Sequence, residues 1–150
     1  MAVSTFSAQA QLQKGVQVQV NARDFSFTID EPTELGGTNE GMNPVEALLG
    51  SLGACQAIVA SVYAKKFAVQ LDDFRVEVEG DIDLDGFFGL AEVRAGYSEI
   101  RYRFHIVSPS SKENIDALVA HLQKHCPVGD SLAAPVKLVL SDVVVQTQAA

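Results

Sequence analysis

The chain contains two cysteines, Cys55 and Cys126, and these are its strongest candidates for nucleophilic chemistry. Two cysteines are too few for a disulfide scaffold, and the sequence has no C-x-x-C pair. In a reducing cytosol, a cysteine pair that does form a disulfide is more often redox-active than structural. Thiol oxidation and disulfide formation are therefore the first reactions to consider.

Cys55 falls in the segment 43–66, whose sequence predicts one long helix. Asn43 suits the N-cap, Pro44 the first helical position and Glu46 the third, an arrangement close to a capping box. Apolar residues recur at helical spacing, and Cys55 lies on their face. Two interpretations stay open: Cys55 is a buried small hydrophobe, or it is a nucleophile.

A stripe of small residues on the same predicted helix includes Gly50. Glycine inside a helix costs about 1 kcal/mol relative to alanine, so the stripe indicates a close backbone approach. We expect another helix there, or the same helix of a second subunit.

Cys126 stands between His125 and Pro127, where the sequence predicts the start of a short helical turn over 127–133. A thiol at a helix N-terminus beside a histidine can have a lowered pKa, which makes it reactive. The alternative is a cysteine that only ends the preceding helix.

Two patterns could bind metal. Residues 81–92 match D-x-D-x-D-G-x5-E, the calcium loop of an EF-hand, but their flanks alternate as strands where an EF-hand needs helices. His121, His125 and Cys126 could form part of a zinc site. The two histidines also suit the end of a helix, where the dipole favours them. We expect no resident metal.

The rest of the chain predicts the elements that position the cysteines. Alternation predicts strands over 12–22 and 25–30 as a hairpin, and over 74–82, 96–108 and 136–146. A second helix is predicted over 110–124, with Ser110 and Glu113 forming a capping box. The order ββαββαβ has no repeat or linker, which predicts a single α+β domain over 1–150 with a mainly antiparallel sheet.

The composition excludes some classes of partner. The net charge of −8 and pI near 4.7 argue against binding to a nucleic-acid backbone. No apolar run is expected to reach the roughly 20 residues that span a bilayer. The N-terminal residues lack the basic and apolar regions of a secretory signal. We expect a cytoplasmic protein without membrane contact.

The two cysteine segments together resemble the OsmC/Ohr family of thiol-dependent peroxidases. N-P-x-E-x-L-L-x5-C runs from Asn43 to Cys55, and H-C-P-V-x3-L runs from His125 to Leu132. The resemblance covers most of the chain, from the leading hairpin to the final strand. It implies an OsmC/Ohr-like fold with a long central helix that bears the cysteine, and an intertwined homodimer with active sites at the interface.

The resemblance also implies a mechanism. Cys55 matches the peroxidatic cysteine, whose thiolate attacks the O–O bond of an organic hydroperoxide and becomes a sulfenic acid. Cys126 matches the resolving cysteine, which condenses with it to a disulfide. An external thiol then reduces the disulfide, and in the organic hydroperoxide branch this thiol is a dithiol of the lipoyl type. The resemblance therefore implies no bound cofactor. An apolar pocket around Cys55 would favour alkyl hydroperoxides over hydrogen peroxide.

Family members place an arginine beside the peroxidatic thiol, because burial alone would raise its pKa and leave it inert. Arg23, in an A-R-D segment, resembles the G-R-D segment that carries this arginine in the Ohr branch. Arg101 and Arg103 are rivals, but alternation points both away from the apolar face of their strand.

Glu46 is shifted by one position from the glutamate that holds this arginine in the family, where this chain has Val45. On one straight helix, Glu46 and Cys55 lie about 13 Å apart and on opposite faces. Glu46 therefore serves the Cys55 of a partner subunit, or it is only a helix cap. The departure at Val45 also favours a second hypothesis, an OsmC-fold protein that binds a small apolar or thiol ligand with little turnover.

Overall fold

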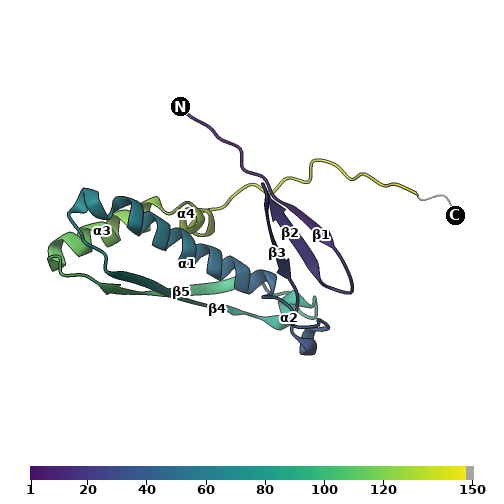
Figure 1. Cartoon of the computed structure of the whole chain (residues 1–150). Coiled ribbons are helices and arrows are strands. Elements are labelled where there is room, and N and C mark those ends of the chain that lie inside the picture. The colour runs from purple at the N-terminus through teal and green to yellow at the C-terminus, as the bar shows by residue number, and fades with distance from the viewer. Residues whose placement is uncertain (148–150) are drawn as a thin grey trace.

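The computed structural model describes residues 1–147, so three residues of the domain predicted over 1–150 lie outside the described part. The described chain is α+β with antiparallel strand pairing and one long helix, as predicted, but its strands form two sheets and not one (Figure 1). In chain order the elements are β1 (Gln9–Leu12), β2 (Val18–Ala22), β3 (Phe25–Ile29), η1 (Thr33–Leu35), α1 (Pro44–Tyr63), η2 (Ala64–Phe67), β4 (Asp73–Ile82), α2 (Leu84–Phe87), β5 (Tyr97–Val107), α3 (Lys112–His125) and α4 (Pro127–Ala133).

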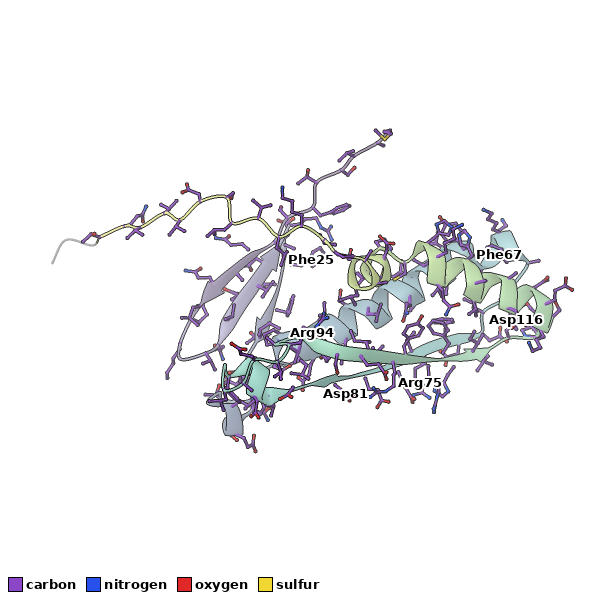
Figure 2. All side chains as sticks on the ribbon, turned by 180° about the vertical axis from the view of Figure 1, so that it is seen from behind. Phe25, Phe67, Arg75, Asp81, Arg94 and Asp116 are labelled. Carbon is purple, nitrogen blue, oxygen red and sulfur yellow. The ribbon has the colours of Figure 1, made fainter. Side chains whose placement is uncertain are left out.

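The body of the molecule is built from β4, β5 and the three longer helices (Figure 1). Strands β4 and β5 pair antiparallel, with Val76 opposite Phe104, and α1 lies over one face of the pair. The other face is charged, and Arg75 and Asp81 project from it away from the helices (Figure 2). Arg101 belongs to this outer face, where it pairs with Asp81, Glu79 and Glu99, so the predicted direction of its side chain is confirmed.

The core forms where α1 and α3 meet. Val59, Ala60 and Leu122 are buried together, and Cys55 and Phe104 pack against them. A second cluster continues this packing toward η2 and contains Ala64, Val69 and Leu118. The apolar stripes of the two amphipathic helices therefore hold Cys55 at the edge of the core.

The start of α1 confirms the predicted capping box. Asn43 Oδ1 accepts a hydrogen bond from the Glu46 N–H at 2.9 Å, and Glu46 Oε2 accepts one from the Asn43 N–H at 2.9 Å. The small-residue stripe meets β4 of the same chain, where a Cβ added at Gly53 would lie 3.3 Å from Val78 Cγ2. Gly50 has nothing within 4 Å in this chain, so the expected second helix is not supplied by the described residues.

The strand predicted over 12–22 is two strands. Gly15 has φ of +61°, a left-handed conformation that turns the chain between β1 and β2. Two backbone hydrogen bonds close this turn, from Gln13 N–H to the Gln17 carbonyl and from Gln17 N–H to the Lys14 carbonyl. The alternation of valines runs on beyond the turn, which is why the pattern did not reveal it.

The strand predicted over 136–146 is wrong for the described chain. This segment is extended but belongs to neither sheet, and it projects from the body together with the β1–β2–β3 sheet (Figure 1). Its alternating apolar residues are exposed, Leu138 at 93%. A strand requires a neighbouring strand to pair with, and the described part of this chain does not bring one to the segment.

The second predicted helix begins two residues later than expected. Ser111 is the N-cap of α3, and its hydroxyl accepts a hydrogen bond from the Asn114 N–H at 3.2 Å. The Ser110 hydroxyl instead accepts a hydrogen bond from the Gln70 N–H at 2.8 Å, so the capping box predicted from Ser110 and Glu113 is wrong.

The expectation about apolar length was also wrong. Residues Pro44–Phe67 form a helical stretch of 24 residues with a mean hydropathy of 1.6, long and apolar enough to cross a membrane. The alanines raise this value, although each adds only one methyl group to the helix surface. Core helices of soluble proteins meet the same criterion, and one side of α1 packs on β4, α3 and α4.

Candidate functional site

The structure brings the two predicted cysteines together. Cys55 is half-buried near the middle of α1, and Cys126 is 2% exposed at the junction of α3 and α4. Both are free thiols, and the Cys126 thiol lies beside the Cys55 thiol. Their proximity depends on the packing of α1 against α3 and α4, since the two residues are far apart in sequence.

The pKa of Cys126 is raised, first by burial and then by the neighbouring Cys55 thiol. The N–H of Gly129 partly opposes this by donating a hydrogen bond to Cys126 Sγ at 3.3 Å. The predicted lowering of this pKa by a helix terminus and His125 is therefore wrong, because burial outweighs the backbone dipoles. Cys126 is consequently less suited than an exposed thiol to act as the initial nucleophile.

Cys55 lies at the boundary between the core and an exposed apolar surface. Its neighbours on the same side of α1, at helical spacing, are Leu48, Ile58 and Val62. These side chains are 38%, 63% and 67% exposed, whereas Val59, one turn after Cys55 on the flank toward the core, is buried. An apolar molecule resting on this surface, termed here the α1 stripe, would lie next to Cys55.

A cavity of about 570 Å³ lies between α1, β5 and α4. Cys126 is among the residues that line it, and Cys55 is not. The walls are mainly apolar, with Leu52, Ile82, Ile100 and Leu132 among them. Its polar lining includes Gln56, Tyr97 and Gln123.

These polar groups differ in how they are satisfied. The Tyr97 hydroxyl donates a hydrogen bond to the Val45 carbonyl at 2.7 Å, and Gln123 Nε2 donates one to the Tyr102 hydroxyl at 3.4 Å. Gln56 is only 2% exposed, and its Oε1 has no hydrogen-bond partner among the described residues. The sequence analysis missed Gln56, although a glutamine beside Cys55 within an apolar stripe was a visible signal.

Glu46 stands at the start of α1, in the capping box, and lines a separate cavity of about 380 Å³ between α1 and β4. No described hydrogen bond links it to either cysteine. The expectation that Glu46 does not reach the Cys55 of its own chain agrees with this placement. Its charge contributes to raising the pKa of Tyr97, after the larger effect of burial.

Arg23 lies in the turn between β2 and β3, in the left-handed conformation with φ of +53°. Its guanidinium lies 4.9 Å from the ring centroid of Phe25, on the sheet that stands apart from the body (Figure 2). Within the described residues no hydrogen bond or ion pair joins Arg23 to either cysteine. The structure of one chain therefore does not bring the predicted arginine to the predicted thiol.

The metal-binding patterns are not assembled in the described chain. Within residues 1–147, no three His, Cys, Asp or Glu side chains gather as ligands for an ion. In the 81–92 segment, Asp81 pairs with Arg101 and Asp83 caps the short helix α2. His121 stacks on Tyr63 and His125 with ring centroids 4.3 Å and 4.2 Å apart, and burial lowers its pKa.

Asp30 fixes the loop that leads into α1, and sequence reasoning missed it as well. It is 1% exposed and accepts hydrogen bonds from the Thr38 hydroxyl at 2.6 Å and from the backbone of Glu31 and Glu40. The hydrogen bond from Thr38 is the main cause that lowers the Asp30 pKa to about 2. A Cβ at Gly37 would lie 1.9 Å from the Glu31 carbonyl oxygen, so this loop requires glycine there.

Comparison with known proteins gives a consistent family. The model of the OsmC-like protein family matches residues 37–141. The chain is 27% identical over 131 residues to a hydroperoxide reductase of Mycoplasma genitalium, covering 85% of this chain and 86% of the relative. It is also 27% identical over 123 residues to the uncharacterized protein YmaD of Bacillus subtilis, covering 81% and 76%.

Solved structures show the same fold. The crystal structure of an OsmC-like protein from Mycoplasma pneumoniae superposes with a TM-score of 0.77 at 24% identity, covering 88% of this chain and 89% of that one. A hypothetical protein from Aquifex aeolicus gives a TM-score of 0.70 at 17% identity, covering 87% and 89%. The match of the family model across both cysteines, together with this shared fold, places the chain in the OsmC-like family.

Proposed function

We propose that this protein is a thiol-dependent peroxidase that reduces organic hydroperoxides. The observation that carries the proposal is the pairing of a half-buried Cys55 on α1 with a buried Cys126 beside it. A relative that matches over 85% of this chain and 86% of its own length is named a hydroperoxide reductase, which supports the same activity here. We propose that this peroxide reduction serves antioxidant defence in the cytoplasm.

The proposed reaction has two steps at these sulfurs. The Cys55 thiolate attacks the terminal oxygen of ROOH, the O–O bond breaks, and RO⁻ takes a proton to leave as ROH while Cys55 becomes a sulfenic acid. The Cys126 thiol then attacks the Cys55 sulfur, the S–O bond breaks, and water leaves as the disulfide forms. An external thiol or dithiol of the lipoyl type returns both cysteines to thiols.

The α1 stripe supports the choice of substrate class. Leu48, Ile58 and Val62 lie on the same side of α1 as Cys55 and offer an apolar surface to the R group of a hydroperoxide. Burial of a methylene contributes about 0.8 kcal/mol, so a bulky organic hydroperoxide gains binding energy that hydrogen peroxide lacks.

A homodimer is part of the proposal. The β1–β2–β3 sheet, with Phe25 at 64% exposed, and the 136–147 segment together leave extensive apolar surface uncovered. Monomeric proteins seldom expose apolar patches of this kind. A second copy would cover these surfaces, pair with the 136–147 segment, and bring its own Arg23 and Glu46 toward the Cys55 of its partner. Light scattering at micromolar concentration tests this, and a monomer would contradict it.

The decisive experiment is intact mass with a thiol count, before and after one equivalent of cumene hydroperoxide. Loss of both thiols and of about two mass units supports the peroxidase. Two unreacted thiols would contradict it and favour the alternative, an OsmC-fold protein that holds a small apolar or thiol ligand. The unpartnered amide of Gln56 in the cavity is the observation that favours this second function.

A further inference from the structure

The two sulfurs of the site face different surroundings. Cys126 lines the cavity of about 570 Å³ between α1, β5 and α4, whereas Cys55 does not line it and lies beside the α1 stripe. A molecule inside the cavity therefore meets Cys126 first. A molecule on the α1 stripe meets Cys55 first. Leu48 of the α1 stripe also lines the cavity, so the two approaches adjoin and differ in which sulfur they reach first.

Gln56 indicates that the cavity is built to hold a ligand. An amide oxygen that is buried without a partner costs about 1–3 kcal/mol, and Gln56 is 2% exposed with Oε1 unpaired. Gln123, which lines the same cavity, already donates to the Tyr102 hydroxyl. A bound molecule that carries a hydrogen-bond donor would satisfy the Gln56 oxygen.

The walls of the cavity favour an uncharged ligand, because they are mainly apolar. Arg94 and Glu99 are the charged residues among its lining, and Glu99 is already paired with Arg101 at 2.7 Å. Arg94 lies at the end of the body nearest the three-stranded sheet (Figure 2). The chain as a whole carries a net charge of −8, which repels anionic thiols.

We infer that this cavity is the entry site for the reducing thiol, that Gln56 Oε1 accepts a hydrogen bond from it, and that it attacks Cys126 Sγ of the disulfide. The inference rests on the proposed function, because it concerns the reduction of the disulfide that the peroxide reaction forms. The ligand class is a small uncharged thiol or dithiol with a hydroxyl or amide donor.

The step balances as two thiol–disulfide exchanges. The thiolate of the reductant attacks Cys126 Sγ, the S–S bond breaks, and Cys55 leaves as a thiolate ready for the next hydroperoxide. A second thiol then attacks the sulfur of the bound reductant, Cys126 leaves and takes a proton, and the reductant departs as its own disulfide. The raised pKa of Cys126 makes it the poorer leaving group, which agrees with expulsion of Cys55 first.

Trapping tests the site of attack. The full chain is oxidised to the disulfide with diamide, which does not depend on its peroxidase activity, and is mixed briefly with 2-mercaptoethanol. N-ethylmaleimide then quenches free thiols before peptide mapping. The expected product carries 2-mercaptoethanol on Cys126 and maleimide on Cys55. The reverse pattern, with 2-mercaptoethanol on Cys55, would overturn the inference.

Kinetics tests the role of Gln56. Reduction of the disulfide by 2-mercaptoethanol and by 1-propanethiol, which has nearly the same shape but no donor, is compared in the wild type and in Gln56→Met. The preference for 2-mercaptoethanol should fall about fivefold in the variant, the value of one lost hydrogen bond. Gln70→Met, at an exposed glutamine that bonds Asp72, is the matched control and should keep the preference. An unchanged preference in Gln56→Met contradicts the role assigned to Gln56.

A second variant covers the case in which Gln56→Met does not fold. Leu132 lines the cavity from α4 and is 40% exposed, so Leu132→Trp should fit while narrowing the cavity. Reduction by both thiols should then slow more than oxidation by cumene hydroperoxide. Equal effects on both steps would contradict entry through the cavity. Failure of the wild type to react with peroxide would overturn the proposed function. The tests that start from diamide-oxidised protein would still show whether a thiol enters through the cavity and attacks Cys126.

Discussion

Gly129 and Cys126 are in close contact at the start of α4. The Gly129 N–H donates to Cys126 Sγ at 3.3 Å, and a Cβ added at Gly129 would lie 3.4 Å from the same sulfur. Leu52 Cδ1 would lie 3.7 Å from that Cβ, so the added atom would be in van der Waals contact on both sides. The position of the buried thiol is therefore set by a glycine three residues further along the chain.

Gly129→Ala should slow disulfide formation. The added methyl group would contact Cys126 Sγ at 3.4 Å and restrict the movement that the sulfur needs to reach an oxidised Cys55. We expect sulfenic acid on Cys55 to persist longer after a peroxide pulse, as detected by a dimedone adduct in mass spectra. Ser131→Ala, at an exposed residue of α4 whose hydroxyl donates to the Pro127 carbonyl, is the control. Equal adduct yields in the two variants would contradict the contact's importance.

The single-cysteine variants separate the two sulfurs. Cys55→Ser should abolish peroxide reduction, because it removes the proposed nucleophile. Cys126→Ser should allow one round of oxidation, visible as a sulfenic acid, but should stop turnover with a thiol reductant that needs the disulfide. Consumption of cumene hydroperoxide measures both, and retained turnover in Cys55→Ser would contradict the mechanism.

Asp30 should make the fold sensitive to acid. Its pKa is lowered to about 2 in the folded chain, whereas the ordinary pKa of an aspartate is near 4. The ionised carboxylate therefore stabilises the fold fully when the pH is above about 4. This contribution should be lost as the pH falls from about 4 to 2. Asp30→Asn should lower the melting temperature at pH 7 and flatten its dependence on pH in this window. Asp24→Asn, at an exposed turn residue, should leave both unchanged.

Substitutions at Glu46 should show whether it is only a helix cap or also acts across the dimer interface. Glu46→Gln keeps an oxygen for the Asn43 N–H, so a pure cap should lose neither stability nor activity. Glu46→Ala should cost about 0.5–1 kcal/mol of unfolding free energy through the lost cap. If Glu46 also holds Arg23 beside the Cys55 of the partner subunit, Glu46→Gln should slow peroxide reduction while the melting temperature stays the same. Paired measurements of rate and melting temperature separate the two.

Local patterns predicted the body of the fold. The capping box at Asn43 depends only on residues close to it in sequence. The same holds for the alternation of apolar and polar residues in the strands that contain Phe74 and Phe104, so the sequence was enough to predict these elements. The pairing partner of the 136–147 segment does not lie in the described chain, so alternation alone could not place it. The turn at Gly15 was hidden because the alternation of valines continued past it.

The site was predictable only in part for a similar reason. The spacing around Cys55 and Cys126 identified both thiols, and the fold brings them together. The raised pKa of Cys126 depends on how deeply α3 and α4 bury it, which is a property of tertiary packing. The lack of a hydrogen-bond partner for Gln56 Oε1 likewise depends on what packs around it. The sequence shows a polar residue in an apolar stripe, but it does not show whether that residue finds a partner.

The packing of Cys55 on α1 against Cys126 at the start of α4 has a consequence for unfolding. A disulfide between them would close a loop of about 70 residues, and such a loop restricts the unfolded chain by up to about 4 kcal/mol at room temperature. The oxidised chain would then resist heat and proteases better than the reduced one. By the same linkage, any change that loosens the α1–α4 contact would make the disulfide easier to reduce. The free energy of unfolding and the resistance of the disulfide to reduction are therefore coupled in this molecule.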